Sequence, residues 1–229
     1  MRRGSIEVVS FDFDGTLVNT STAMEEATTI LIRNISLISG INYSQLYRSY
    51  TSISEELSKK GNYSRHVWIK ETLKHFNVIV RNSEITRFVK EYWEYITENS
   101  SPYDEVMEVL AYLKKKGYAI AILTNTDGLY GVKMKRILKI FPKNLFDYIV
   151  IAGEDTSKPK PHVEAFYKLT REANVYPEKV IHVGDDYLAD IVGCFKAGLK
   201  CVLVDREDKI RSFKNTVIIG DLKKLLKFL

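Results

Sequence analysis

Residues 7–16 have the sequence EVVSFDFDGT. The β-branched and aromatic residues at positions 8, 9 and 11 predict a buried strand over 7–11, and two acidic residues, Asp12 and Asp14, follow it directly. Ligands of doubly wound parallel sheets bind beyond the carboxyl ends of the strands. If the strand belongs to such a sheet, this stretch places two carboxylates where a binding site forms.

From about residue 103 onward, short apolar runs alternate with segments of helical periodicity. Strands whose apolar runs are continuous, separated by helices, are typical of a parallel sheet covered on both faces. The fold class that we predict is therefore α/β with a doubly wound parallel sheet. The expected strands are 118–123, 148–151, 180–183, 201–204 and 217–219, and the expected helices are 104–116, 130–140, 162–174, 188–197 and 222–228.

The block from residue 20 to residue 99 has a different character. Its apolar residues, such as Met24, Ala27 and Leu31, recur at helical spacing, and no buried strand is evident. The turn-forming residues at 99–102 then return the chain to the α/β pattern. We therefore predict a catalytic core made of residues 1–19 and 100–229, interrupted by an all-helical domain over 20–99.

Composition excludes several other classes of protein. The 229 residues include 34 Lys+Arg and 29 Asp+Glu, giving a net charge of +5. The interspersed charges argue against disorder, and no low-complexity tract or repeat is present. The amino terminus lacks the apolar run of a secretory signal, and no apolar stretch is long enough for a membrane helix. These features favour a cytoplasmic protein without a membrane partner.

Two further compositional features bear on the environment of the protein. Cys194 and Cys201 lie in apolar surroundings and do not form a disulfide framework, so we expect two buried, reduced thiols. Gln45 is the only glutamine, whereas Lys, Glu and Arg are abundant. That bias resembles the composition of thermophilic proteins.

Polar residues follow several of the expected strands. Each group taken alone is typical of a turn, a helix cap or a solvated loop. Together they would bring acids, a hydroxyl group and a lysine to one edge of the sheet. Besides Asp12 and Asp14, these residues are Thr124, Asn125, Lys158, Lys160, Asp185, Asp186 and Asp190.

Metal-assisted phosphoryl transfer requires this combination of groups. Carboxylate oxygens suit Mg²⁺, and a lysine, a hydroxyl group and an amide neutralise or hold the phosphoryl oxygens. His182 lies inside an apolar strand and is expected to be a core residue. The sequence contains no Ser-His-Asp order, phosphate-binding GxxxxGK[ST] loop, HExxH or paired CxxC that would favour another catalytic class.

Four ordered segments resemble the motifs of the haloacid dehalogenase superfamily. They are FDFDGTLV (11–18), ILTN (122–125), SKPKPHVEAF (157–166) and VIHVGDDYLADIVGCFKAGL (180–199). The similarity is to the branch with a helical cap after the first motif, which includes phosphoglycolate phosphatase-like small-molecule phosphatases. The resemblance spans essentially the whole chain and implies a Rossmann-like core with a helical cap.

The resemblance also implies roles for individual residues. Asp12 would be the nucleophile, and Asp14 would be the general acid and base. Asp12, the main-chain carbonyl of Asp14, and Asp185 would bind Mg²⁺, while Asp190 would order the lysine or a metal-bound water. The five-residue step to Asp190 selects Asp185 over Asp186, which would strengthen metal binding or cap the following helix.

The phosphate contacts follow in the same way. Thr124, Asn125 and a lysine would bind the transferring phosphoryl group. The family pattern of lysine, proline, any residue, proline and then an apolar helix places this lysine at Lys158, with Lys160 as the alternative.

The resemblance leaves more than one reaction open. Asp14 disfavours a dehalogenase, because displacement of halide needs neither a leaving-group acid nor a metal. We expect a Mg²⁺-dependent phosphatase that hydrolyses a small phosphate monoester through an aspartyl-phosphate, with a phosphomutase as the alternative. Basic clusters at 114–116, 133–139 and 206–214 could indicate a nucleic-acid-binding module, but they are expected on exposed helix faces, so we expect no nucleic-acid partner. The sequence leaves the oligomeric state open.

Substrate choice is expected to depend on the helical cap. Asn19 stands where related phosphoglycolate phosphatases tend to carry an aspartate, which weakens the case for that substrate. The polar and aromatic candidates for substrate contact are Asn19, Tyr43, Arg48, Arg65, His66, Trp68 and Lys70.

Overall fold

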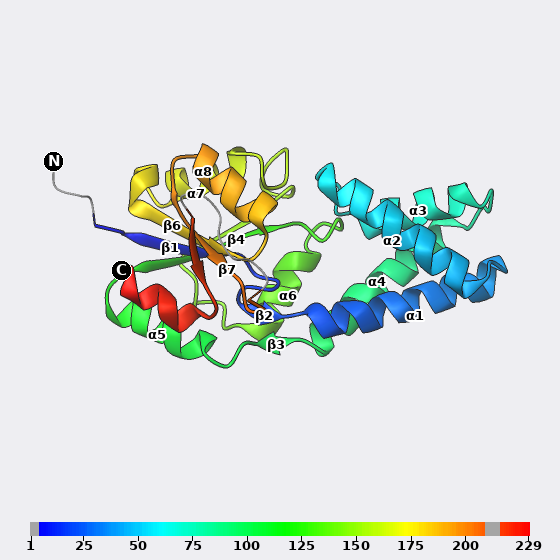
Figure 1. Cartoon of the computed structure of the whole chain (residues 1–229), viewed down its shortest axis with the longest axis horizontal. Coiled ribbons are helices and arrows are strands. Elements are labelled where there is room, and N and C mark those ends of the chain that lie inside the picture. Colours follow the sequence, from blue (N-terminus) through cyan, green and yellow to red (C-terminus); the bar gives the residue numbers. More distant parts are fainter. Residues whose placement is uncertain (1–4, 209–215) are drawn as a thin grey trace. The chain divides into compact units, whose positions relative to one another are not determined.

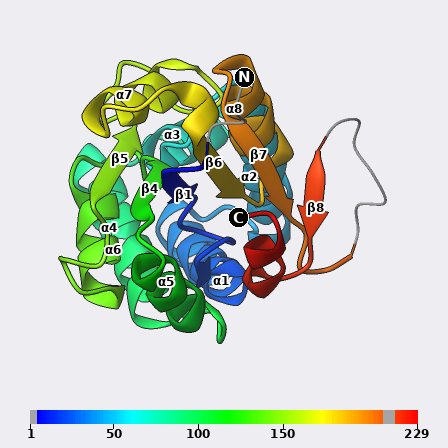
Figure 2. The same cartoon turned by 90° about the vertical axis from the view of Figure 1, so that its left-hand side faces the viewer.

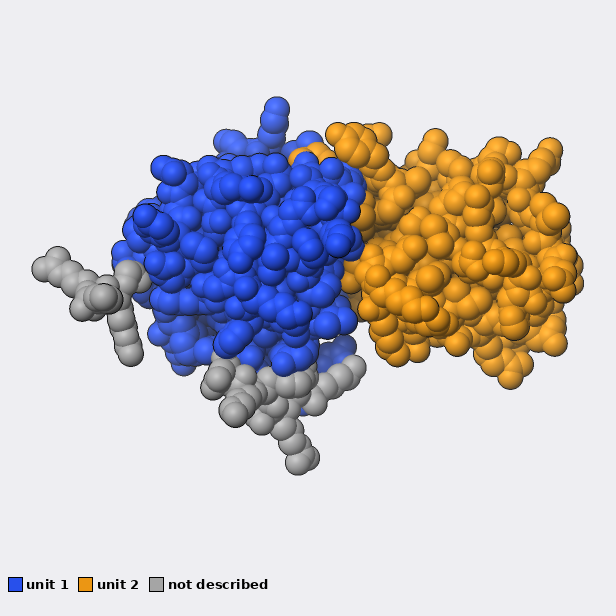
Figure 3. Space-filling model, turned by 90° about the horizontal axis from the view of Figure 1, so that it is seen from above, with its two compact units in different colours: residues 1–19, 101–125, 137–229 blue, residues 20–100, 126–136 orange. Residues whose placement is uncertain are grey.

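The structure is a computed structural model that describes residues 5–208 and 216–229 (Figure 1). The chain forms two compact units (Figure 3). The first, called the α/β unit, consists of Met1–Asn19, Ser101–Asn125 and Ile137–Leu229, and the second, called the helical unit, consists of Thr20–Ser100 and Thr126–Arg136. The sequence prediction differs for 126–136, which it placed in the core.

Among the described residues, the α/β unit contains a six-stranded sheet whose paired strands are all parallel. The strand order is β5-β4-β1-β6-β7-β8, so β1 lies in the middle, as Figure 2 shows. The predicted α/β fold is confirmed. The strands are β1 (Val8–Phe11), β4 (Ala119–Asn125), β5 (Tyr148–Ala152), β6 (Val180–Gly184), β7 (Lys200–Val204) and β8 (Val217–Ile219).

Helices cover both faces of this sheet because successive strand residues point to opposite sides. Val9 and Phe11 pack with α5 (Val106–Lys115) and the 3₁₀ helix η3 (Leu222–Lys227), whereas Val8 packs with α7 (Glu164–Glu172) and α8 (Gly193–Lys196). Burial on both faces explains why the strand sequences are continuously apolar.

Some local structure differs from the sequence prediction. The expected helix over 188–197 is a π-helical segment, η2 (Tyr187–Val192), followed by the short α8, and the last expected helix is the 3₁₀ helix η3. Two very short strands, β2 (Val18–Asn19) and β3 (Ser101–Pro102), were not predicted and pair antiparallel where the chain leaves and re-enters the α/β unit. A further 3₁₀ turn, η1 (Pro177–Lys179), precedes β6.

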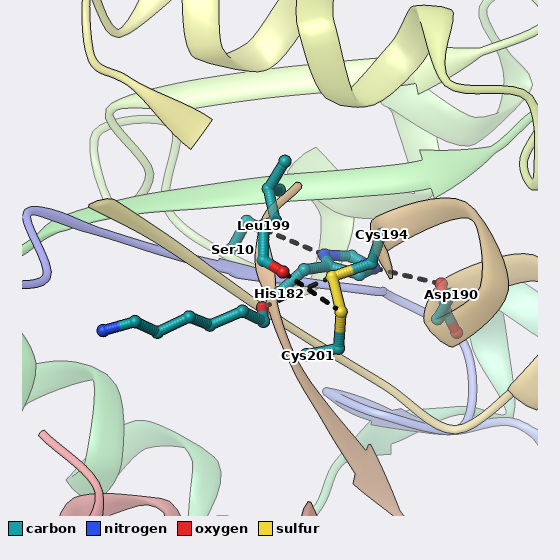
Figure 4. Close-up of a disulfide and its surroundings, with 7 residues drawn as sticks. Ser10, His182, Asp190, Cys194, Leu199 and Cys201 are labelled. Carbon is teal, nitrogen blue, oxygen red and sulfur yellow. Dashed lines mark hydrogen bonds and ion pairs between the residues drawn. A yellow bond between two sulfur atoms is a disulfide. The ribbon is translucent and has the colours of Figure 1, made fainter. Parts of the chain in front are cut away.

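The expectation of two reduced thiols is wrong, because Cys194 and Cys201 form a disulfide (Figure 4). Their Cα atoms are 6.1 Å apart. Gly198, with a φ of +80°, turns the chain between α8 and β7 and thereby brings the two cysteines together. The sequence spacing alone did not indicate this proximity.

The helical unit contains α1 (Ser21–Ser39), α2 (Tyr43–Lys59), α3 (Arg65–His75) and α4 (Asn82–Glu98). Its core gathers the apolar positions that recur at helical spacing, including Leu31 of α1 and Trp93 of α4. Asn42 caps α2, because its side chain accepts hydrogen bonds from the backbone N–H groups of Ser44 and Gln45. No strand interrupts the described part of the segment 20–99, as expected.

The segment 126–136 adds a buried ion cluster to the helical unit. Asp127 accepts from Lys133 at 2.8 Å and from Arg136 at 3.0 and 3.1 Å, and the Arg136 guanidinium lies 4.9 Å from the centroid of the Trp93 ring. Leu129 also packs against the helical core. This packing explains why the segment groups with the helical unit, although part of α6 (Val132–Ile140) belongs to the α/β unit.

The basic clusters do not all lie on exposed faces. The expectation holds for the lysines at 114–116 but is wrong for Lys133 and Arg136, which are buried because Asp127 pairs with both. Arg206 of the third cluster is half-buried and pairs with Glu105 at 2.8 Å. Residues 209–214 of that cluster lie outside the described residues.

In the described part of the chain, every helix is too short or too polar to traverse a bilayer.

Replacing Asp127 with alanine removes the carboxylate that Lys133 and Arg136 share. We expect the free energy of unfolding of the helical unit to fall by about 3–5 kcal/mol, the usual cost of breaking a buried ion pair from one side. Urea unfolding followed by tryptophan fluorescence measures this effect, because both tryptophans of the chain, Trp68 and Trp93, lie in this unit.

The matched control is Glu56→Ala, which removes the exposed pair with Lys60. We expect a change of about 0.5 kcal/mol or less, as for other surface pairs. An equal effect of the two substitutions would contradict the importance of the buried cluster.

Candidate active site

The three central strands of the sheet end at one edge. Asp12 directly follows β1, Thr124 and Asn125 are the last residues of β4, and Asp185 directly follows β6. Because β1 lies between β4 and β6, this edge is the point where the strand order reverses, which is the usual ligand position in doubly wound sheets.

A buried lysine joins the acidic residues at this edge. The Lys160 Nζ donates to Asp12 Oδ1 at 2.7 Å, to Asp190 Oδ1 at 2.5 Å and to the carbonyl of Leu123 at 2.9 Å. Lys160 is only 1% exposed. Burial would lower the pKa of its ammonium group, but the charges of Asp12 and Asp190 outweigh that effect and raise it. Lys160 therefore carries a positive charge in the site.

The structure places Lys160, not Lys158, beside Asp12 and Asp190. This corrects the sequence-based choice of Lys158 as the site lysine. Lys158 is exposed, and its carbonyl accepts from the Thr156 hydroxyl group. Asn125 turns Lys160 inward by accepting from its backbone N–H at 2.7 Å and donating to its carbonyl at 3.4 Å. Both lysines precede a proline, so the local sequence pattern did not distinguish them.

Asp12 is nearly buried, with 8% of its surface exposed. Its backbone N–H donates to the carbonyl of Val183 at 2.8 Å, which extends the pairing of β1 and β6 by one residue. Burial and the nearby Asp190 and Asp14 raise the pKa of Asp12 to about 6, despite the opposing effect of Lys160. The carboxylate thus lies in a site of low polarity with one strong cationic partner.

The loop after Asp12 approaches the end of β6 closely. Gly15 has a φ of +77°, and a Cβ atom built on it would lie 2.2 Å from Asp185 Oδ2. Thr16 donates to Asp185 Oδ1 at 3.0 Å. Only glycine therefore fits at position 15, and Thr16 is a site residue that the sequence analysis missed, although it directly follows the Asp-Phe-Asp-Gly run.

Three carboxylates form a potential metal site. One oxygen from each of Asp12, Asp185 and Asp190 lies within 4.8 Å of the others. Partial desolvation and repulsion from Asp12 and Asp190 raise the pKa of Asp185, although Asp185 is exposed. A divalent cation would relieve this repulsion, and carboxylate oxygens are the donors that Mg²⁺ prefers. The residues present therefore fit such an ion.

The cluster overlaps the predicted metal set without matching it. Asp12 and Asp185 belong to both, whereas Asp190 belongs to the cluster alone, and ligation by the main-chain carbonyl of Asp14 stays a prediction. Both oxygens of Asp190 already accept hydrogen bonds, Oδ1 from Lys160 and Oδ2 from the backbone N–H of Asp186, so Asp12 and Asp185 are the better candidates for metal ligands.

Asp190 is held by several hydrogen-bond donors. Besides Lys160, His182 Nε2 lies 3.1 Å from Oδ1, and the backbone N–H of Asp186 donates to Oδ2 at 3.1 Å. Burial alone would raise the pKa of Asp190, but Lys160 and His182 lower it. The Asp186 side chain caps η2 by accepting from Ala189 N at 2.9 Å.

Residues proposed from the helical segment have mainly internal contacts. The Arg65 guanidinium lies 4.0 Å from the Trp68 ring centroid and donates to the carbonyl of Tyr63 at 3.1 Å. Tyr43 stacks on Tyr47. These contacts stabilise the helical unit, and a role in substrate choice stays a prediction for the candidates Asn19, Tyr43, Arg48, Arg65, His66, Trp68 and Lys70.

Comparison with known proteins adds independent information. A family model described as haloacid dehalogenase-like hydrolase matches residues 9–204. A glyceraldehyde 3-phosphate phosphatase of Pyrococcus furiosus is 30% identical over 213 residues, covering 88% of this chain and 81% of that protein. The pyrophosphatase PpaX of Bacillus mycoides is 28% identical, covering 98% and 97% of the two chains.

Solved structures share the fold. The crystal structure of the HAD-hydrolase YfnB from Bacillus subtilis bound to magnesium has a TM-score of 0.78 at 19% identity and covers 99% of both chains. At that level of identity the likeness shows the fold alone.

Lys158 and Lys160, in the loop before α7, provide a direct test of the site geometry. Lys160→Met leaves Asp12 and Asp190 without their shared cation, so we expect the free energy of unfolding of the α/β unit to fall by about 3 kcal/mol at neutral pH. Urea unfolding followed by circular dichroism measures this change. Lys158→Met is the control and should change it by less than about 0.5 kcal/mol; a larger loss for Lys158→Met than for Lys160→Met would refute the placement.

Proposed function

We propose that this chain, which belongs to the haloacid dehalogenase-like hydrolases, is a phosphatase that hydrolyses a small phosphate monoester through an aspartyl-phosphate on Asp12. The observation that carries the proposal is the position of Asp12 at the reversal point of the sheet, 2.7 Å from the buried ammonium of Lys160. An anionic nucleophile can approach a negatively charged phosphoryl group only where cations offset the repulsion between them.

In the first step, a carboxylate oxygen of Asp12 attacks phosphorus, and the bond between phosphorus and the leaving oxygen breaks. Asp14 gives its proton to that oxygen, so the alcohol leaves neutral. The Thr124 hydroxyl group holds an equatorial phosphoryl oxygen, and the nearby positive charge of Lys160 offsets the negative charge that is spread over these oxygens in the transition state. We assign Asn125 to holding the backbone of Lys160, in keeping with its hydrogen bonds.

In the second step, water attacks the phosphorus of the aspartyl-phosphate, and the deprotonated Asp14 accepts the proton of that water. The bond between phosphorus and the Asp12 oxygen breaks. Inorganic phosphate leaves, Asp12 is again a carboxylate and Asp14 is again protonated, so the cycle is complete.

Asp12 and Asp185 are the carboxylates that we propose as ligands of Mg²⁺, together with the main-chain carbonyl of Asp14. When bound, the ion supplies positive charge that offsets repulsion between the phosphoryl oxygens and the acidic residues. Thr16 and Gly15 support this role by fixing the position of the Asp185 carboxylate. Asp190 is assigned to orienting Lys160.

The proposed substrate class is a small phosphorylated metabolite. The two relatives described above are named for glyceraldehyde 3-phosphate and for pyrophosphate, so both compounds belong in the first test panel. The presence of Asp14 argues against carbon–halogen chemistry, which does not need a leaving-group acid. Mutase activity would appear in the same panel as an isomerised phosphate ester without release of inorganic phosphate.

The testing experiment measures phosphate release by the purified full chain, with Mg²⁺, from p-nitrophenyl phosphate, glyceraldehyde 3-phosphate, pyrophosphate and other small phosphate esters. We expect release from at least one monoester. Asp12→Asn should abolish it, and Asp14→Asn should lower kcat by about 10²–10⁴, the usual contribution of a general acid and base. Unchanged turnover in folded Asp12→Asn protein would refute the proposed nucleophile.

Removal of divalent ions provides a separate prediction. Treatment with EDTA should abolish turnover, and added Mg²⁺ should restore it. Asp185→Asn should raise the Mg²⁺ concentration needed for half-maximal activity by about tenfold or more, because it removes an anionic ligand.

The matched control for the metal prediction is Asp186→Asn, since the side chain of Asp186 caps η2 and lies outside the acidic cluster found among the described residues. Its Mg²⁺ requirement should stay within about twofold of the wild-type value. Equal Mg²⁺ requirements for Asp185→Asn and the wild type would count against Asp185 as a ligand.

A further inference from the structure

A row of buried polar side chains leads from the interior of the sheet to Lys160. Ser10 Oγ is 2.8 Å from His182 Nδ1, and His182 Nε2 is 3.1 Å from Asp190 Oδ1 (Figure 4). The same Asp190 oxygen accepts from Lys160, which in turn donates to Asp12. Hydrogen bonds therefore connect Ser10 to Asp12 without a break.

The sheet brings this row together. Ser10 of β1 and His182 of β6 are direct partners in the parallel register. Ser10 and His182 are 0% exposed and Asp190 is 1% exposed. The Phe166 and His182 rings pack in a T-shaped arrangement at a centroid distance of 5.3 Å. Polar groups buried this deeply are costly unless each is hydrogen-bonded, so a row of them in an apolar layer calls for an explanation.

The direction of each hydrogen bond follows from the charges. Asp190 faces the ammonium of Lys160 and is ionised, so its carboxylate only accepts. His182 Nε2 must then carry a hydrogen, which leaves Nδ1 to accept from the Ser10 hydroxyl group. Burial lowers the pKa of His182, in keeping with a neutral ring. Both nitrogens are used: the Asp190 carboxylate requires the tautomer with hydrogen on Nε2, and the Ser10 hydroxyl group satisfies Nδ1.

We propose that Ser10 and His182 are positioning residues of the phosphatase reaction, which act through Asp190 to hold the Lys160 ammonium at Asp12. The inference rests on the proposed function. Asp190 Oδ1 accepts from both His182 and Lys160, while Oδ2 accepts from the backbone of Asp186. Loss of the His182 donor would allow the carboxylate to rotate, and the ammonium bound to it would move with it.

Packing alone does not account for this pair. The residues two positions before Ser10 and His182, on the same face of the sheet, are Val8 and Val180, which are buried, so this layer accepts aliphatic side chains. An apolar pair would fill the same layer without burying polar groups. It would also leave Asp190 with one hydrogen-bond donor fewer, which is the cost that the present residues avoid.

The test compares kcat and KM for p-nitrophenyl phosphate, with Mg²⁺, among wild type, Ser10→Ala, His182→Leu, the double variant and His182→Gln. We expect kcat to fall by about 10–100-fold in His182→Leu, with a smaller change in KM, because Lys160 acts most strongly on the transition state. His182→Gln should recover most of kcat, since its amide can still donate to Asp190.

The double variant separates a connected row from two independent core defects. If Ser10 acts through His182, the double variant should have the kcat of His182→Leu, whereas independent effects would multiply. Thr170→Val is the control, because it removes another buried hydroxyl group, one that donates to the carbonyl of Tyr167 in α7. Its kcat should stay within about twofold of wild type.

Several outcomes would overturn the inference: wild-type kcat in folded His182→Leu, no recovery in His182→Gln, or multiplied effects in the double variant. If His182→Leu does not fold, the kcat of the smaller change Ser10→Ala tests the proposal instead. A wild-type kcat in that variant refutes the proposal. Failure of the proposed function looks different, because wild type itself would then release no phosphate from any ester.

Discussion

The ammonium group of Lys160 between Asp12 and Asp190 is the interaction on which the site depends. Burial of a lysine or a carboxylate costs several kcal/mol per ion, and the cost is recovered only when the geometry satisfies every donor and acceptor. Here the backbone carbonyl of Leu123 accepts the remaining hydrogen of the ammonium group. Asn125 fixes the backbone of the lysine at the same time. The end of β4 therefore determines where the positive charge lies.

The order of the strands explains why these groups meet. β1, β4 and β6 are neighbours in the sheet although they are far apart in sequence. Polar side chains end β4 and directly follow β1 and β6. Close approach then requires small residues. A Cβ atom at Gly184 would lie 2.2 Å from Asp190 Cγ, and one at Gly15 would lie equally close to Asp185. The two glycines allow three carboxylates and a lysine to share one strand edge.

The sequence predicted the fold well because alternating apolar strands and helices reflect burial on both faces of a sheet, a constraint that acts at every position. It also placed Asp12 and Asp185 at one edge of the sheet, since each directly follows a strand. It failed at Lys158, because adjacent Lys-Pro pairs look alike and only Asn125, distant in sequence, selects Lys160. The disulfide of Cys194 and the burial of Lys133 likewise depend on turns and partners that local patterns do not encode.

The net charge of +5 is a poor guide to function because it does not show which charges are buried against distant partners. Lys133, Arg136 and Lys160 contribute to that count, yet all three are buried against carboxylates and present little charge to solvent. A charge in a medium of low polarity acts strongly over a few ångströms, whereas an exposed lysine is screened by water and salt. The charges that determine the chemistry are thus the few that folding removes from solvent, and their effect depends on which partners the fold supplies.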